Sequence, residues 1–215
     1  MVTLIEAQTR IRTGMQYLTQ SIAVDAYILD ALKETQRDLE IGKSLPKFLI
    51  TEDATFTGLA GVATANLPAD YIRLAEEHVP VWTSSDNQST RELKIDAYGY
   101  LRQVWFGSTL STPQAMAIRK SSIVLFPTPG DAWTVTYSYY AHAAILVAPS
   151  DENVWLANVP DLLINGAGMR FAADRQDKEN AAKFSTLYAA NYASYLAKIV
   201  DEELQDQSVV MGGNR

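Results

Sequence analysis

The sequence contains no cysteine and only two histidines, His78 and His142, among its 215 residues. Without cysteine, the chain can form no disulfide, no thiol nucleophile and no cysteine-based zinc or iron–sulfur site. The two histidines lie far apart in the sequence, so they cannot form a two-histidine metal motif on one helix. We therefore expect no metal and no cofactor, and we interpret each histidine as a surface or interface side chain.

Long apolar runs and positive charge are also scarce. No run of about 18 apolar residues occurs, and the N-terminus does not resemble a secretory signal, so we expect a soluble, intracellular protein that does not enter a membrane. Lysine and arginine number 18 against 25 aspartates and glutamates, which gives a net charge of -7. An acidic chain of this kind is a poor candidate for binding the phosphates of nucleic acid.

Catalytic motifs are missing as well. Gly42-Lys43-Ser44 resembles the end of a phosphate loop, but position 37, where the first glycine of that motif would stand, is Arg37. The Gly-x-Ser-x-Gly turn of many hydrolases does not occur. Acidic pairs such as Glu76-Glu77 are interpreted as solvated. We expect no enzyme, although a small hydrolase that uses an unrecognised carboxylate pair is left open.

The first forty residues have the pattern of two helices. Thr3 and Glu6 have the spacing of a capping box, and Gly14 weakens or ends the first helix. Gly42 and Pro46 end the second helix. Its apolar positions recur at steps of three and four residues: Val24, Tyr27, Ile28, Ala31, Leu32, Thr35 and Leu39.

The C-terminal part returns to helix. Pro160 stands where a first-turn proline would, and Gly166 and Gly168 in that helix indicate a close-packed neighbour, because glycine lowers helix propensity. A last helix is expected from about Lys178. At 1.5 Å per residue it would be roughly 40 Å long.

The middle of the chain, in contrast, has a β pattern. A hairpin is predicted between residues 123–126 and 133–140, because the turn-forming residues 127–131 lie between them. A second pairing is predicted between residues 115–119 and 123–126. Another strand is expected between Ile72 and Trp82, interrupted by Pro80. A short helix is expected within residues 91–106.

Together these patterns predict an α+β fold: a helical bundle formed by the N- and C-terminal helices, with an inserted antiparallel β region. Helices with an apolar stripe are not stable alone, so the two ends of the chain are expected to pack together. The expected divisions are residues 1–45 and 150–206 for the bundle, 46–149 for the β-rich domain and 207–215 for a flexible tail.

The last helix and the tail have more apolar residues than one packing partner needs. Tyrosine suits an interface because it joins a large apolar body to a hydrogen-bonding tip. The candidate interface residues are therefore Tyr192, Tyr195, Ile199, Leu204, Val209, Val210 and Met211.

Several segments, taken in order, resemble the head-to-tail adaptor proteins of tailed double-stranded DNA bacteriophages, which are also called connector or head-completion ring proteins. These segments have the order strand, Pro-x-Pro turn, strand ending in paired tyrosines, Trp-Leu, and a helix beginning with Pro-Asp. They are residues 67–74, 123–129, 137–140, 155–156 and 159–167.

This resemblance implies a structural virion protein that forms a homo-oligomeric ring, commonly of twelve subunits, and has no catalytic activity. The ring would join the portal protein of the capsid to tail components at the head-to-tail junction, after assembly in the host cytoplasm. DNA would pass through it as cargo without specific binding, and an acidic lumen would repel the phosphates. The alternative is a monomeric α+β protein-binding module without catalytic activity.

Overall fold

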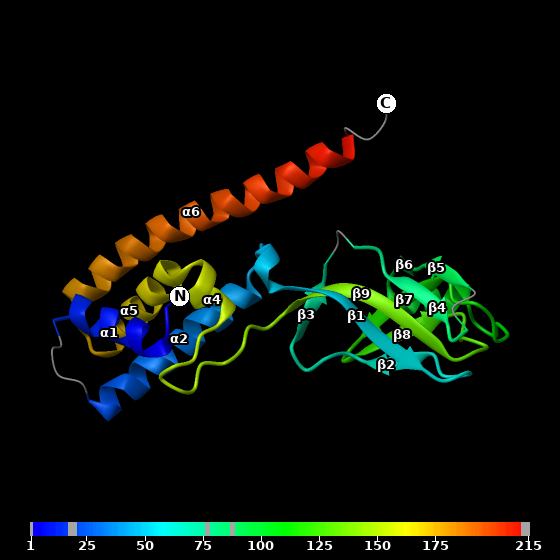
Figure 1. Ribbon diagram of the computed structural model, residues 1–215, viewed down its shortest axis with the longest axis horizontal. Helices are drawn as coiled ribbons and strands as arrows, with labels where there is room; N and C mark the ends of the chain where they lie inside the picture. Colours follow the sequence, from blue (N-terminus) through cyan, green and yellow to red (C-terminus); the bar gives the residue numbers. More distant parts are fainter. Residues whose placement is uncertain (1, 17–20, 76–77, 87–88, 212–215) are drawn as a thin grey trace. The chain divides into compact units, whose positions relative to one another are not determined.

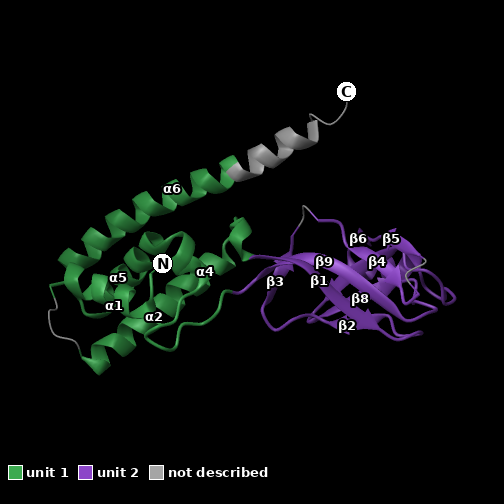
Figure 2. Ribbon diagram, in the orientation of Figure 1, with its two compact units in different colours: residues 1–49, 143–215 green, residues 50–142 purple. Residues whose placement is uncertain are grey.

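The computed structural model describes residues 2–16, 21–75, 78–86 and 89–211, and the side chains of these as far as residue 201. It divides the chain into two units (Figure 2). Unit 1 joins residues 1–49 to residues 143–215, and unit 2 is the continuous segment 50–142. Helices occupy unit 1, and both sheets lie in unit 2, so the predicted α+β class is confirmed (Figure 1).

Unit 1 is a helical bundle built around α5. The N-terminal helices α1 and α2 both pack on α5, as do α4 and α6, so the prediction that the two ends of the chain pack together is confirmed. Its helices are α1 (Leu4–Gly14), α2 (Ile22–Ile41), α4 (Val154–Asn158), α5 (Pro160–Asp174) and α6 (Lys178–Met211), with a 3-10 turn at Lys47–Leu49.

The ends of α1 and α2 follow the predicted signals. The Thr3 backbone N–H donates to the Glu6 carboxylate at 3.0 Å, and the Glu6 N–H donates to the Thr3 hydroxyl at 3.4 Å, which is a complete capping box. Helix α2 ends before Gly42, and its buried stripe includes Ile28, Leu32 and Leu39.

The glycines of α5 lie where neighbouring helices come very close. A Cβ atom added at Gly168 would lie 2.7 Å from the Phe184 ring of α6. One added at Gly166 would lie 2.5 Å from Cγ2 of Thr35 in α2 and 2.9 Å from the Tyr188 ring of α6. The close-packed neighbour expected from these glycines is therefore confirmed.

A buried polar network ties α2 to the chain that returns from unit 2. The Glu40 carboxylate accepts hydrogen bonds from Trp155 Nε1 at 2.9 Å, Gln36 Nε2 at 3.0 Å and the Ala143 N–H at 3.1 Å. The Asn153 amide donates to Gln36 Oε1 at 2.8 Å. Each partner satisfies a group that would be costly to bury alone.

Unit 2 consists of two sheets around a shared core, whose largest buried side chains include Trp133, Met116 and Leu125. One sheet has the order β1-β9-β4-β5, with β3 also paired to β9; the other has the order β2-β8-β7-β6, in which only β6 and β7 are parallel. The first contains β1 (Ile50–Gly58), β9 (Trp133–Ala141), β4 (Val81–Ser84), β5 (Thr90–Glu92) and β3 (Tyr71–Leu74). The second contains β2 (Thr64–Asn66), β8 (Ser122–Phe126), β7 (Ala115–Arg119) and β6 (Lys94–Ile95).

One predicted hairpin is correct and the other is wrong. Strands β7 and β8 pair through a tight turn in which Lys120 has a φ of 54°, as expected. Strands β8 and β9, however, belong to different sheets, so the segment 127–131 carries the chain across the core instead of reversing it.

Three further boundaries differ from the expectation. The single strand expected from Ile72 to Trp82 is two strands, β3 and β4, which both pair with β9. In the segment 91–106 only α3 (Tyr98–Val104) is helical. The backbone of α6 is helical to Met211, so it includes part of the expected tail 207–215.

Among the helices that the structure describes, none combines the length and hydrophobicity needed to cross a bilayer.

Candidate interaction surfaces

The candidate interface residues of α6 fall into three groups. Tyr195 and Ile199 are buried inside unit 1, and the ring of Tyr195 lies 6.1 Å from that of Trp155. Tyr192 is 37% exposed and stacks on Tyr188 at 5.9 Å. The side chains of the remaining four, Leu204, Val209, Val210 and Met211, lie outside the described part of the chain. Burial of Tyr195 and Ile199 serves their own subunit, and an intersubunit role for the set stays a prediction.

The outer face of α6 is uncharged over several turns. Between Lys183 and Lys198 the sequence has no charged residue. Exposed positions on this stretch include the small side chains Ser185, Ala189 and Ala193. Small side chains allow another helix to approach closely, so this face is suited to packing rather than to solvation.

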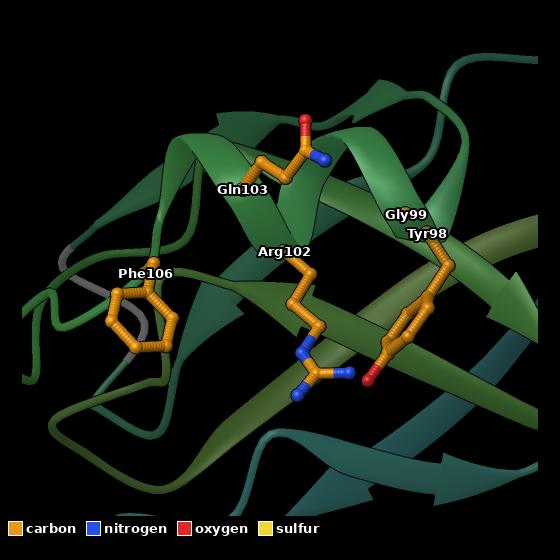
Figure 3. Close-up of a pocket in the computed structure, with 5 residues that line it drawn as sticks. All are labelled: Tyr98, Gly99, Arg102, Gln103 and Phe106. Carbon is orange, nitrogen blue, oxygen red and sulfur yellow. The ribbon is translucent and has the colours of Figure 1, made fainter.

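A second surface lies on unit 2, over α3. The helix is fixed by Leu101, which is buried beside Ala115 and Ala117 of β7. A surface hollow of about 720 Å³ lies along the helix. Figure 3 shows the side chains that line it. It is lined by Tyr98, Gly99, Arg102, Gln103 and Phe106.

One cationic side chain, Arg102, lines this hollow, and a second, Arg119, lies beside Tyr98. Arg119 donates to the Tyr98 hydroxyl at 3.1 Å, and its guanidinium lies 4.6 Å from the centre of the Tyr98 ring. Arg102 is exposed and forms no ion pair with any residue whose side chain is described. The surface can therefore bind a carboxylate of a partner as well as apolar side chains.

The described ionisable groups in the core of unit 2 are not suited to proton transfer. Burial raises the pKa of Tyr71 to about 12, and burial is also the main cause that raises the pKa of Tyr137. Both hydroxyls are therefore protonated at neutral pH. The hydroxyl of Tyr137 and Nε1 of Trp82 are buried and have no hydrogen-bond partner in the described part of the chain. In that same part, no cluster of three or more histidine, aspartate and glutamate side chains could hold a metal ion.

Sequence reasoning did not find the α3 surface. The segment 98–106 is rich in aromatic and aliphatic residues, a composition that normally indicates core. Only the packing shows that Leu101 is buried whereas Tyr100, Val104 and Phe106 are exposed by 53%, 54% and 84%.

Comparison with known families accounts for nearly the whole chain. Residues 2–215 match the family described as SU10 adaptor protein. The chain belongs to this family. No curated protein matches the sequence.

Membership of the SU10 adaptor family confirms the resemblance to phage head-to-tail adaptors, which the segments between residues 67 and 167 carry. As a phage adaptor, the chain is a structural component of the virion and associates with other head or tail proteins. The match extends over both units.

Proposed function

We propose that this SU10 adaptor protein forms a homo-oligomeric ring that joins the portal of the capsid to the tail and lets DNA pass through. The match to an adaptor family over residues 2–215 carries this proposal. Each subunit would use two different surfaces to contact its two neighbours, which is the kind of contact that closes a ring. Twelve copies agree with the resemblance to connector proteins.

Helix α6 is the proposed contact with the portal. The last described buried side chain on it is Ile199, yet its backbone continues as helix to Met211, which adds about 18 Å at 1.5 Å per residue. Its uncharged outer face, with Tyr192 at its edge, supports contact with sister subunits. The apolar residues Leu204, Val209, Val210 and Met211 in the helix end support contact with the portal.

The charge of the chain supports passage of DNA without capture. A net charge of -7 on each subunit is repeated around a ring, and repeated negative charge in a lumen repels phosphates within about 10 Å at moderate ionic strength. DNA is therefore proposed as cargo and not as a bound ligand.

Truncation of α6 tests the portal contact. A chain lacking residues 204–215 should keep the melting temperature of the full chain and lose binding to isolated portal rings, measured by light scattering and electron microscopy. The matched control lacks only residues 212–215 and should bind. Normal portal binding by the chain that lacks residues 204–215 would contradict the assignment of the portal contact to α6. A complex in which one adaptor monomer binds one portal monomer, without a ring, would contradict the ring and favour the monomeric protein-binding module.

A further inference from the structure

The two edges of the sheet that contains β9 are β1 and β5, both labelled in Figure 1. Strand β9 lies between β1 and β4, and β5 pairs with β4. Apart from this strand pairing, no backbone hydrogen bond joins residues 54–58 or 90–92 to another part of the chain that the structure describes. Each edge therefore presents peptide groups that another strand can bind.

A hydrogen bond at the end of β5 determines which of its peptide groups face outward. Leu93 N–H donates to the Pro80 carbonyl at 2.8 Å, so the peptide groups of Leu93 face β4. In an antiparallel pair, residues whose peptide groups face the partner strand alternate with residues whose peptide groups face away. Arg91 therefore also faces β4, whereas the N–H and C=O groups of Thr90 and Glu92 face outward.

The same alternation continues across the sheet to β1. Ser85 N–H donates to the Ala132 carbonyl at 2.9 Å where β4 and β9 begin to pair. The even-numbered residues of β9 beside β4 therefore turn their peptide groups to β4, and the odd-numbered residues turn theirs to β1. Within residues 54–58, the partners of those odd-numbered residues are the even-numbered ones. Thr55 and Thr57 therefore turn their N–H and C=O groups outward.

The directions of the two edges fit a head-to-tail contact between copies of the chain. Each neighbouring pair in the order β1-β9-β4-β5 is antiparallel, so β1 and β5 run in opposite directions. A second copy in the same orientation can place its β1 antiparallel to β5 of the first copy, and this contact repeats from copy to copy. A repeated contact between two different surfaces builds a ring when the rotation closes.

The outward groups and the charges favour one register for this contact. When Thr90 lies opposite Thr57 of the next copy, Glu92 lies opposite Thr55, and all the outward peptide groups of both edges pair. A shift of two residues in one direction would set Glu92 opposite Asp53, and like charges directly opposite are unfavourable. A shift in the other direction would move Thr90 past the end of β1.

Charge complementarity favours β5 as the partner of β1. In the favoured register Lys94, whose side chain is 72% exposed, lies beside the exposed Glu52 and Asp53 of the next copy. Lys94 forms an ion pair with Asp96 at 3.1 Å, and its ammonium group has three N–H donors, so it can bind a second carboxylate. Two β1 strands paired with each other would set the acidic pair beside uncharged residues, and two β5 strands would set Arg91 opposite Arg91.

We propose that β5 of one copy binds the free edge of β1 of the next copy, so that the sheets of neighbouring subunits continue into one another. The proposal rests on the ring proposed above and assigns one of its subunit contacts to these two strands.

A disulfide tests this contact directly, because the chain contains no cysteine. Opposed Cα atoms of an antiparallel hydrogen-bonded pair lie about 5.5 Å apart, within disulfide range, whereas Thr57 and Thr90 of one copy lie three strands, roughly 14 Å, apart. In adaptor–portal complexes, Thr57→Cys with Thr90→Cys should give a ladder of covalent oligomers on a non-reducing gel after mild oxidation. The matched control combines Thr57→Cys with Thr83→Cys and should stay monomeric, because Thr83 lies opposite Thr90 one strand further from the edge.

The outcomes separate this contact from the ring itself. Rings without a ladder would overturn the edge contact and leave the proposed ring standing, and this is the result expected if another protein binds the edge. A product that stops at the dimer would also overturn it, because a head-to-tail contact repeats. If the parent chain forms no ring, both the proposed function and this contact are contradicted.

A proline at position 57 tests the backbone hydrogen bonds of the contact. Thr57→Pro removes an N–H that faces outward, so the subunit should keep the circular dichroism spectrum of the parent. We expect at least a tenfold loss of rings on isolated portals, counted by electron microscopy, whereas Thr57→Ala should form rings normally. Normal ring formation by Thr57→Pro would overturn the proposal. If Thr57→Pro does not fold, the disulfide result decides.

Discussion

Glycine at position 168 is required by the distance between two helices. A methyl group there would lie 2.7 Å from Phe184, closer than carbon atoms approach each other. We expect Gly168→Ala to lower the free energy of unfolding by about 1–2 kcal/mol, because overpacking costs more than the roughly 1 kcal/mol gained in helix propensity. Urea unfolding measures the difference.

The control for this change is Gly99→Ala in α3, where an added methyl group meets no atom within 4 Å. This variant should be as stable as the parent or more stable by up to about 1 kcal/mol. Equal losses at the two glycines would show that the close approach of Phe184 is not the cause.

Glu40 is a second single residue on which stability depends, because its carboxylate accepts hydrogen bonds from three buried donors. Glu40→Ala leaves Trp155 Nε1, Gln36 Nε2 and the Ala143 N–H without this acceptor. We expect a loss of about 3 kcal/mol or more in the free energy of unfolding. Trp155→Phe removes one donor together with its hydrogen bond and should cost clearly less by the same urea measurement. A loss for Glu40→Ala below that of Trp155→Phe would contradict the network.

At the scale of elements, Asp177 stabilises the start of α6. Its carboxylate accepts from the Asn180 side chain at 2.8 Å and from the Asn180 N–H at 3.1 Å, and these bonds hold its pKa below the usual value. Because the pKa is lower in the folded chain, the stabilisation is complete above about pH 4–5 and disappears as the pH falls through the folded value. Asp177→Ala should therefore lower the melting temperature at pH 7 and have a smaller effect near pH 3. A difference that does not depend on pH would contradict this explanation.

Helices could be predicted from the sequence better than strand partners could, because helix signals are local and strand pairing is not. The Thr3–Glu6 capping box and Gly42 act within a few residues, so their effect is readable locally. The alternation in residues 133–140 predicts a strand and says nothing of its neighbours, and β9 pairs with β1, β3 and β4 rather than with β8. Strand β1 was not predicted, although Thr55-Phe56-Thr57 has the alternation of a strand.

The candidate surfaces were harder still to predict, for a physical reason. An aromatic residue has the same appearance in a sequence whether it is buried or exposed. Tyr195 was chosen as an interface residue and is buried, whereas Phe106 was not chosen and is 84% exposed. Sequence similarity identified the family, but the position of its exposed apolar residues needed the folded chain.

At the scale of the whole molecule, each unit has its own core. The two buried clusters of unit 2 contain only residues between Ala54 and Ala141, and its first and last strands are paired at the point where the chain enters and leaves. Residues 50–142 expressed alone should therefore give a folded β protein with a cooperative melting transition. Circular dichroism and the dispersion of amide proton signals in NMR spectra measure this.

The complementary chain replaces residues 50–142 by a short Gly-Ser linker and keeps α1, α2, α4, α5 and α6. Because Ile50 and Tyr140 are direct strand partners, the residues on either side of the replaced segment are close enough for such a linker. This helical chain should fold and, if α6 makes the portal contact, should still bind portal rings, whereas the isolated β unit should not. Binding of the portal by residues 50–142 alone would reverse the proposed roles of the two units. Failure of one piece to fold would show that its core depends on the other unit.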